Sequence, residues 1–486
     1  MIQADFLAIR NALAVLPSDH DASGQHRPTV DEIFTPKQHA NALDPNTPVV
    51  VGARGTGKSF WAGVLEQNET REVAASAYPN LGLNRLIVRP GYNGLAADDV
   101  VTAKTIDARV PPGSESEKAS DFWLAIILRA TKSALNPNDE TMTVREVMEQ
   151  YADPEDWQKE IRMLDEKLTT SGNTLLIIFD ALDTISKDWQ RSNLLLDALF
   201  EAIWSLRARR SIRAKIFIRP EQLNDEALSF VELPKLRSGC VELNWAQVDL
   251  YGLLFWRLAT TSDIKGSFGK LVKQIDAPVP DNLEVNRHYW PLIIDTNLQK
   301  DAMTLMAGAY MGSSKTKGGT YNWPYKHLGD ANGKVTPRSF IKLFVEAAKR
   351  QAPVTQVISA DGIRHGLREA SKVRVDQLGI EYKWIKRALA PLAGLTIPCT
   401  QEALYDRWKE TNTIKLILDA SSDSDTGFLP PFPPRSRKNH MELLATAMVQ
   451  IGLFSYRSDG RIDIPDLFRV AAQMLKRGGT PPIQRS

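Results

Sequence analysis

The sequence predicts an α/β fold with a five-stranded parallel core, a helical lid and a small C-terminal α+β domain. Three observations support this fold class. The β-branched run Val49–Val51 leads into a glycine-rich turn and then into a pattern with helical spacing. The run Leu175–Phe179 is apolar throughout and ends in a carboxylate, and a strand that is apolar on both faces belongs inside a parallel sheet. Further short apolar runs alternate with helical patterns up to about residue 248, as in a sheet that helices cover on both faces.

The first strand leads into residues 52–59, whose sequence is Gly-Ala-Arg-Gly-Thr-Gly-Lys-Ser. Two glycines followed at this spacing by Lys58 and Ser59 are typical of a phosphate-binding P-loop. The glycines let backbone N–H groups turn inward around a phosphate, and the helix that begins at Lys58 adds its positive dipole end. Lys58 can then reach the β and γ phosphates of ATP, and the Ser59 hydroxyl can bind Mg²⁺. The alternative is a glycine-rich loop that matches the motif by chance. The predicted nucleotide contacts are Gly52, Arg54, Gly55, Thr56, Gly57, Lys58, Ser59 and Phe60.

Asp180 follows the buried strand Leu175–Phe179 directly. Ligands of open α/β sheets bind at the carboxyl ends of the strands, so Asp180 is predicted to lie beside the P-loop. It would then act as the Walker B aspartate, and Ser59 and Asp180 are the predicted metal ligands. Asp183, three residues later, has three interpretations. It could polarise the attacking water, cap the helix that begins near Trp189, or bind Mg²⁺ through water.

Three further short runs complete the predicted sheet. They are Leu86–Val88, Lys215–Ile218 and Val241–Asn244. Arg219 follows the second of these runs, where a cation could sense the γ-phosphate of ATP or form a salt bridge to a surface carboxylate. Arg237 lies just before the last run.

These motifs together resemble the AAA+ and STAND group of P-loop ATPases. The resemblance covers about residues 40–350 and depends on the P-loop at 52–59, on Asp180 with Asp183, and on the two arginines beside strands four and five. It implies Mg²⁺-dependent ATP binding and hydrolysis between a core and a lid.

The resemblance also implies roles for three arginines. Arg219 takes a sensor-1-like place, and Arg237 takes the place of an arginine finger that reaches a neighbouring subunit. Arg338, beside Pro337 at the start of a late helix, takes the place of a sensor-2 arginine that reaches back to the nucleotide. Ala181 replaces the glutamate that usually follows the Walker B aspartate, a departure that is closer to STAND-type switches. The predicted catalytic set is Lys58, Asp180, Asp183, Arg219, Arg237 and Arg338.

The chain is predicted to have five parts. They are an N-terminal helix with an approach segment (1–45), the ATPase core (46–248), the helical lid (249–350), a helical connector and linker (351–434), and a C-terminal domain (435–486).

The C-terminal domain is predicted to contain a helix that ends at Gly452, two short strands joined by a Ser-Asp-Gly turn, and a last helix over Pro465–Lys476. A helix followed by a small β-wing resembles a winged-helix domain. Such a domain can bind DNA phosphates or dock a protein, and both interpretations stay open. Its basic residues are Arg435, Arg437, Lys438, Arg457 and Arg461.

Composition limits the remaining possibilities. A net charge of +2 over 486 residues means that any contact with nucleic acid is local. Cys240 and Cys399 are too few for a disulfide framework and are expected to be buried thiols. No apolar run is long enough to span a membrane, and a cytoplasmic protein is expected. His39, in the approach segment, is either an adenine contact or an exposed loop histidine.

The sequence therefore predicts an ATP-driven switch or an oligomeric ATPase that acts on a partner protein or on DNA, with ATP and Mg²⁺ as ligands. The general architecture suggests bacterial defence systems. The main alternative is a DNA-binding regulator that keeps ATP as a structural ligand with little turnover. A phosphotransferase with a small acceptor is a third candidate.

Overall fold

The computed structural model describes most of the chain, and it divides into two compact units. One unit is Asp21–Asn244, called here the P-loop unit, and the other combines Met1–His20 with Trp245–Ser486, called here the helical unit. The described residues are 5–18, 27–94, 101–136, 142–186, 188–223, 228–261, 265–281, 289–421, 430–432 and 437–482.

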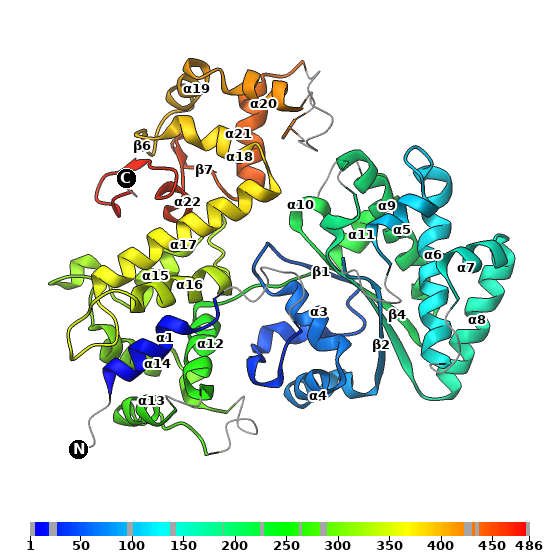
Figure 1. Cartoon of the computed structure of the whole chain (residues 1–486), viewed down its shortest axis with the longest axis horizontal. Coiled ribbons are helices and arrows are strands. Elements are labelled where there is room, and N and C mark those ends of the chain that lie inside the picture. The colour runs from blue at the N-terminus through cyan, green and yellow to red at the C-terminus, as the bar shows by residue number, and fades with distance from the viewer. Residues whose placement is uncertain are drawn as a thin grey trace. The chain divides into compact units, whose positions relative to one another are not determined.

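A parallel sheet forms the centre of the P-loop unit, as the sequence predicts (Figure 1). Its strand order is β2-β3-β4-β1-β5, and every neighbouring pair is parallel. The strands are β1 (Val49–Val51), β2 (Leu86–Tyr92), β3 (Thr174–Phe179), β4 (Ile212–Ile218) and β5 (Val241–Glu242). Because β4 lies between β1 and β3, the residues that follow β4 lie between the P-loop and Asp180.

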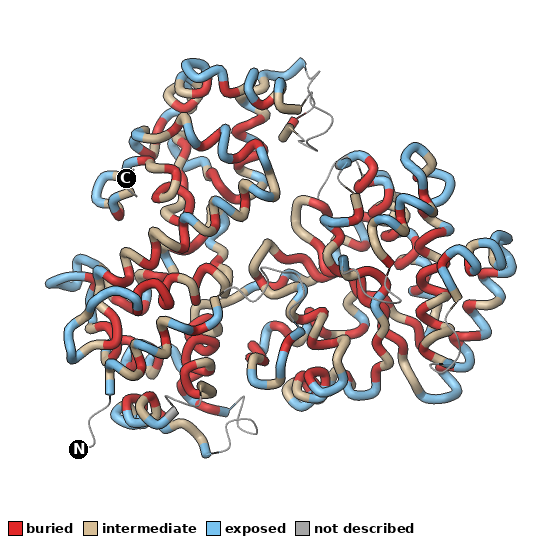
Figure 2. The backbone as a smooth tube through the Cα atoms, in the orientation of Figure 1, coloured by how far each residue is buried: buried red, intermediate tan, exposed pale blue. Residues whose placement is uncertain are grey.

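Helices cover both faces of this sheet, and its central strands β1, β3 and β4 are largely buried (Figure 2). Val50, Leu176 and Phe217 pack on one face against α3 (Lys58–Glu66) and α4 (Asn68–Ala77). The opposite face packs against a second layer of helices. That layer includes α5 (Ala103–Arg109), α6 (Glu115–Leu135), α7 (Val144–Gln150), α8 (Pro154–Thr170) and α9 (Trp189–Ser205). The shorter helices of this unit are α2 (Ala40–Leu43), α10 (Pro220–Leu223) and α11 (Leu233–Ser238).

A buried lysine holds the segment that leads into β1. Lys215 lies on β4, and its ammonium group donates to the carbonyls of Ala42 at 2.9 Å, Asp44 at 2.8 Å and Thr47 at 2.7 Å. Burial lowers the pKa of Lys215 to about 7, while the charge of Asp44 opposes the change. This single side chain satisfies the last carbonyls of α2 and the turn after it, and so positions the strand before the P-loop.

The helical unit begins with α1 (Phe6–Val15), although α1 precedes the P-loop unit in the chain. Arg10 of α1 donates to the carbonyls of Val357 at 2.8 Å, Gln356 at 2.7 Å, Pro353 at 3.1 Å and Ala352 at 3.2 Å. The predicted segment 1–45 is therefore shared between the two units. The other helices are α12 (Gln247–Thr260), α13 (Lys265–Val272), α14 (Thr296–Ala307), α15 (Asn322–Leu328), α16 (Pro337–Ala348), α17 (Ala360–Glu381), α18 (Ile385–Leu389), α19 (Gln401–Glu410), α20 (Thr413–Ser421), α21 (His440–Gln450) and α22 (Asp466–Arg469).

The predicted hairpin near the C-terminus is present. After α21, β7 (Ser455–Tyr456) pairs antiparallel with β8 (Ile462–Asp463). The predicted last helix is wrong, because only α22 forms and β9 (Leu475–Lys476) then pairs in parallel with β6 (Thr396–Ile397). β6, the partner of β9, lies in the segment 351–434 that the sequence predicts as a connector and linker.

Arg469 explains why the last helix ends early. Its side chain is fully buried and donates to Asp466 at 2.6 Å and to the carbonyls of Met474 at 3.0 Å and Thr480 at 2.7 Å. A continued helix would place those carbonyls elsewhere. Asp466 also accepts a hydrogen bond from Nδ1 of His327 on α15, at 2.5 Å.

Within the described residues, no helix has the length and apolar character that crossing a bilayer requires.

Candidate functional site

The P-loop has the backbone that its glycines predict. Gly57 has φ +101°, a left-handed conformation that a residue with a side chain rarely adopts. A Cβ atom at Gly52 would lie 2.5 Å from Oγ1 of Thr56, so the close turn also requires glycine there. Thr56 closes the loop from inside, since its hydroxyl donates to the carbonyl of Ala53 at 2.8 Å. The loop ends where α3 begins at Lys58.

The Lys58 ammonium group lies within this loop. It donates to the carbonyls of Gly52 at 2.7 Å and Ala53 at 3.2 Å. Burial, and to a smaller extent the charge of Arg219, lowers the pKa of Lys58 to about 8. The carboxylates of Asp180, Glu221 and Asp183 oppose this change, in that order of size. Lys58 is therefore surrounded by the ends of β3 and β4, and it stays mostly protonated at neutral pH.

Ser59 and Asp180, the predicted metal ligands, are in contact. Asp180 is 5% exposed at the end of β3, and its backbone N–H donates to the carbonyl of Tyr92 at 2.8 Å. Burial raises the pKa of the Asp180 carboxyl, while a hydrogen bond with Ser59 and the charge of Lys58 lower it. A hydroxyl and a carboxylate side by side fit Mg²⁺, which takes few protein oxygens and fills its other positions with phosphate and water.

Arg219 forms an ion pair with Asp183. Nη2 of Arg219 lies 2.6 Å from Oδ2 of Asp183, and Nη1 lies 3.9 Å from Oε1 of Glu221. Of the two interpretations of Arg219, the structure contains the salt bridge. Asp183 does not cap α9, because the cap of that helix is Asp188, whose side chain accepts from the Arg191 N–H. One predicted role of Asp183 is therefore wrong.

Glu221 is a charged residue of this site that the sequence analysis missed. It lies in α10, two residues beyond Arg219, and its side chain is 24% exposed. The only sequence signal is a carboxylate two residues after the arginine that follows the strand. This signal is weak in the sequence alone, because Glu221 can be placed near the P-loop only once β4 is known to lie between β1 and β3.

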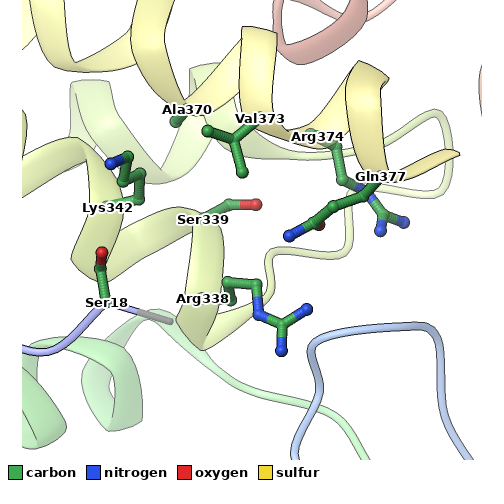
Figure 3. A pocket seen from close by; sticks show the side chains of 8 residues that line it. All are labelled: Ser18, Arg338, Ser339, Lys342, Ala370, Val373, Arg374 and Gln377. Atoms are coloured by element: carbon green, nitrogen blue, oxygen red, sulfur yellow. The ribbon is translucent and has the colours of Figure 1, made fainter. Parts of the chain in front are cut away.

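The other two predicted arginines lie apart from this cluster. Arg237, in α11, donates through Nε and Nη2 to the Leu223 carbonyl at 3.0 and 2.6 Å, within its own unit. Arg338 belongs to the helical unit, at the first turn of α16. It lines a pocket between α16 and α17 that is shown in Figure 3. The other lining residues are Ser18, Ser339, Lys342, Ala370, Val373, Arg374 and Gln377.

The remaining predicted contacts divide between loop and core. Arg54, Gly55 and Thr56 lie in the P-loop, whereas Phe60 lies on α3 and packs edge-on against Trp61, with ring centroids 5.7 Å apart. The prediction that His39 is an exposed loop histidine is wrong, and its contact with adenine stays a prediction. His39 is 1% exposed, its Nδ1 accepts from the Trp61 indole at 3.1 Å, and its Nε2 lies 2.9 Å from the Asn244 carbonyl. Burial lowers its pKa to about 4, so a neutral ring with both nitrogens engaged joins the approach segment to the end of β5.

Comparisons with known proteins add little to this geometry. No protein-family model and no curated protein matches the chain. Among solved structures, the Aeropyrum pernix ORC2 protein in its ADPNP–ADP complexes is 14% identical, with a TM-score of 0.39 over 92% of this chain and 93% of that one. Cdc6p from Pyrobaculum aerophilum is 13% identical, with a TM-score of 0.25 over 88% of this chain and 87% of that one. Likeness at this level carries no functional argument.

Proposed function

We propose that this chain is a Mg²⁺-dependent P-loop ATPase of the AAA+ or STAND kind, which hydrolyses ATP and acts as a switch or within an oligomer. One observation carries the proposal. Lys58, Ser59 and Asp180 meet at the carboxyl edge of a parallel sheet, beside a loop whose glycines are sterically required. An incidental glycine-rich loop has no need of a buried carboxylate from a distant strand.

The residues of the cluster would divide the work of binding. Lys58 leaves the carbonyls of Gly52 and Ala53 and reaches the β and γ phosphates, while the N–H groups of the loop surround them. Ser59 and Asp180 hold Mg²⁺, which neutralises charge on the phosphates when it is bound. The hydrogen bond between these two side chains already orients them toward one point.

Arg219 would act on the γ-phosphate. Its guanidinium is held by Asp183 at 2.6 Å, so the arginine is oriented before ATP binds. A phosphate oxygen competes for the same donors, and a cation placed on developing charge accelerates phosphoryl transfer by orders of magnitude. Asp183 was predicted as a residue that activates water; its contact with Arg219 favours the role of holding that arginine.

Arg237 and Arg338 extend the proposal beyond a single P-loop unit. Arg237 would exchange the Leu223 carbonyl for a phosphate of a neighbouring subunit, and Arg338 would act from the helical unit as a sensor of the nucleotide. Both roles require an assembled, nucleotide-bound state, and both follow from the family resemblance rather than from a contact in the single chain.

Lys58→Ala tests the proposal directly. The variant should lose Mg–ATP affinity and slow phosphate release by about a hundredfold or more, because one fixed donor to a reacting phosphate has that order of effect. Lys37→Ala, at an exposed lysine of the same unit, is the matched control. The proposal is wrong if the parent chain has no measurable affinity for Mg–ATP, or if Lys58→Ala turns over ATP as fast as the parent.

A second candidate is the DNA-binding regulator, with α21 and the β7–β8 hairpin as a winged-helix-like module. Arg457 and Arg461 are each 44% exposed on this hairpin, and they pair with Asp463 at 2.9 Å and Asp459 at 2.7 Å. The Arg461–Asp459 pair is exposed to solvent and contributes little to stability, so a DNA phosphate could displace the acid there. Arg435 lies outside the described residues. Salt-dependent DNA affinity that falls in Arg457→Ala/Arg461→Ala would support DNA as the partner; unchanged affinity would favour a protein.

A further inference from the structure

The turn that follows β3 carries two acidic side chains of the proposed site. Asp180 begins this turn, and Asp183, which lies 2.6 Å from Arg219, comes three residues later. Ala181, between them, has φ +54°, a left-handed conformation that residues with a Cβ atom seldom adopt. Such a conformation persists only where the surrounding contacts hold it. The contacts that fix this turn therefore also set the positions of the two carboxylates.

Tyr92, the last residue of β2, holds the start of the turn through its backbone. It pairs with Phe179 in the ladder between β2 and β3, and its carbonyl accepts from the Asp180 N–H at 2.8 Å. The Asp180 carboxyl also has a hydrogen bond with the backbone of Ala181, which helps to lower its pKa against the effect of burial. The orientation of this carboxyl thus depends on the conformation of the turn.

The hydroxyl of Tyr92 holds the end of the same turn. Tyr92 is 1% exposed, and its hydroxyl oxygen lies 2.8 Å from Oγ1 of Thr184. The Thr184 hydroxyl donates its one proton to the Ala181 carbonyl at 2.8 Å, because a carbonyl can only accept. The Tyr92 hydroxyl is therefore the donor to Thr184. The Thr184 N–H donates to the Ala181 carbonyl as well, at 2.9 Å.

The chain just after Tyr92 packs closely against this turn. Gly94 has φ +72°, and a Cβ atom there would lie 2.9 Å from Cβ of Ala181 and 3.0 Å from Oγ1 of Thr184. A side chain at Gly94 would therefore displace the turn. The close approach keeps the Tyr92 hydroxyl within hydrogen-bond distance of Thr184.

One residue of β2 thus contacts both ends of the turn, and its two contacts can be separated. The backbone carbonyl of Tyr92 holds Asp180, whereas the hydroxyl holds Thr184, the residue next to Asp183. Removal of the hydroxyl alone would release the end that carries Asp183 and leave the backbone contact with Asp180 in place.

We propose that Tyr92 is a positioning residue for ATP hydrolysis, which acts through Thr184 to hold Asp183 where this carboxylate orients Arg219 toward the γ-phosphate. This inference rests on the proposed function. In this role Tyr92 touches neither the nucleotide nor Mg²⁺. Burial raises the pKa of the Tyr92 hydroxyl above its ordinary value, so the hydroxyl keeps the proton that it donates at neutral pH.

Tyr92→Phe and Thr184→Val each remove one side of this hydrogen bond with little change in side-chain shape. Each variant should lower kcat for ATP hydrolysis about 10- to 100-fold, a size typical of contacts that orient the groups of a site. Because the backbone contact with Asp180 remains, the Kd for Mg–ATP should stay within about threefold of the parent value. Thr184→Ser keeps the hydroxyl and should retain most of the parent kcat.

Tyr78→Phe is the matched control. Tyr78 is also a buried tyrosine of the P-loop unit, and its hydroxyl donates to the Pro36 carbonyl at 2.7 Å. Its loss should lower the free energy of unfolding in a urea titration about as much as Tyr92→Phe does, and it should leave kcat unchanged. An equal fall in kcat in both variants would overturn the role of Tyr92, because it would indicate a general weakening of the fold.

The Asp183→Asn background distinguishes positioning from a structural effect. If Tyr92 acts through Asp183, Tyr92→Phe should lower kcat by less than about twofold in a chain that already carries Asp183→Asn, because the two changes affect one contact. Single-turnover assays with excess protein measure these slow rates. A further fall as large as in the parent background would overturn the inference.

The outcomes also separate this inference from the proposed function. If the parent neither binds nor hydrolyses Mg–ATP, the proposed function fails and the role of Tyr92 fails with it. If the parent hydrolyses ATP and Tyr92→Phe does so at a similar rate, only the role of Tyr92 is overturned. A parallel loss of Mg–ATP affinity and kcat in Tyr92→Phe would overturn it too, because that pattern would show that Asp180 has moved.

Discussion

Glu66 offers a stability prediction that can be worked out quantitatively. It is the last residue of α3, and within the described part of the chain its buried Oε1 accepts no hydrogen bond. Burial raises its pKa from the ordinary 4.5 to about 7, the charge of Asp180 adds to this effect, and Arg27 opposes it. The difference corresponds to about 3 kcal/mol between the protonated and ionised forms.

The sign follows from which state binds the proton more tightly. Between pH 4.5 and about 7 the folded P-loop unit holds a proton on Glu66 that the unfolded chain has lost, so stability falls as pH rises through this range. Above the folded pKa the whole cost is present. Glu66→Gln, which resembles the protonated side chain, should therefore stabilise the unit by about 3 kcal/mol near pH 8 and by almost nothing near pH 4.

Urea titration of the parent and the variant at several pH values measures this difference. Glu69→Gln, at an exposed glutamate in the first turn of α4, is the control and should change stability little at any pH. A gain that is equal at acidic and alkaline pH would refute the reasoning, because it would show that packing rather than ionisation is responsible. No gain near pH 8 would show that the Glu66 carboxylate is hydrated.

Three other substitutions probe separate contacts. Asp466→Asn should destabilise the helical unit by about 3 kcal/mol at neutral pH, since it removes the buried carboxylate that pairs with His327 and Arg469. Burial alone would raise the pKa of Asp466, but these partners hold it at about 2, so their stabilisation should be lost as pH falls from the ordinary 3.8 toward 2. Arg10→Met should lower the melting temperature of the same unit through a loss of about 2 kcal/mol, because four carbonyls lose their donor. Gly52→Ala should weaken equilibrium Mg–ATP binding about tenfold or more, because the new Cβ atom crowds the loop.

Matched variants accompany these three. Asp459→Asn removes an exposed acid and should cost little, so a similar loss in both aspartate variants would contradict the importance of burial. The melting temperature of Arg10→Lys should lie between those of Arg10→Met and the parent. Gly239→Ala has room for its Cβ atom, with the nearest atoms at 3.8 Å, and should bind ATP normally. Equal binding by Gly52→Ala would show that the loop opens without cost.

Local patterns were sufficient to predict the core of the P-loop unit. The five predicted runs became five parallel strands, and the signal is strongest for β3, whose continuous apolar run marks a strand that is buried on both faces. The P-loop was also predictable, since positive φ at Gly57 and close packing at Gly52 are demands on neighbouring residues alone. The proximity of Asp180 to Ser59 followed from the rule that parallel strands end at one edge.

Long-range contacts could not be predicted in the same way. The sequence left open whether Arg219 meets a phosphate or a carboxylate, and the order β3-β4-β1 decided that Asp183 and Glu221 flank it. The His39 ring is buried with both nitrogens in hydrogen-bond contact, because Trp61 and Asn244 approach it from other parts of the chain.

By itself, the sequence determined the strands, the phosphate loop and the aspartate opposite it, because each depends on side-chain periodicity or backbone freedom within about ten residues. Only the tertiary structure decided which charges face each other across the sheet edge, that α1 packs in the helical unit through Arg10, and that β9 pairs with β6 in place of a longer helix. Those outcomes depend on closing loops of tens to hundreds of residues, where many partners of similar chemistry compete and only the packed core selects one.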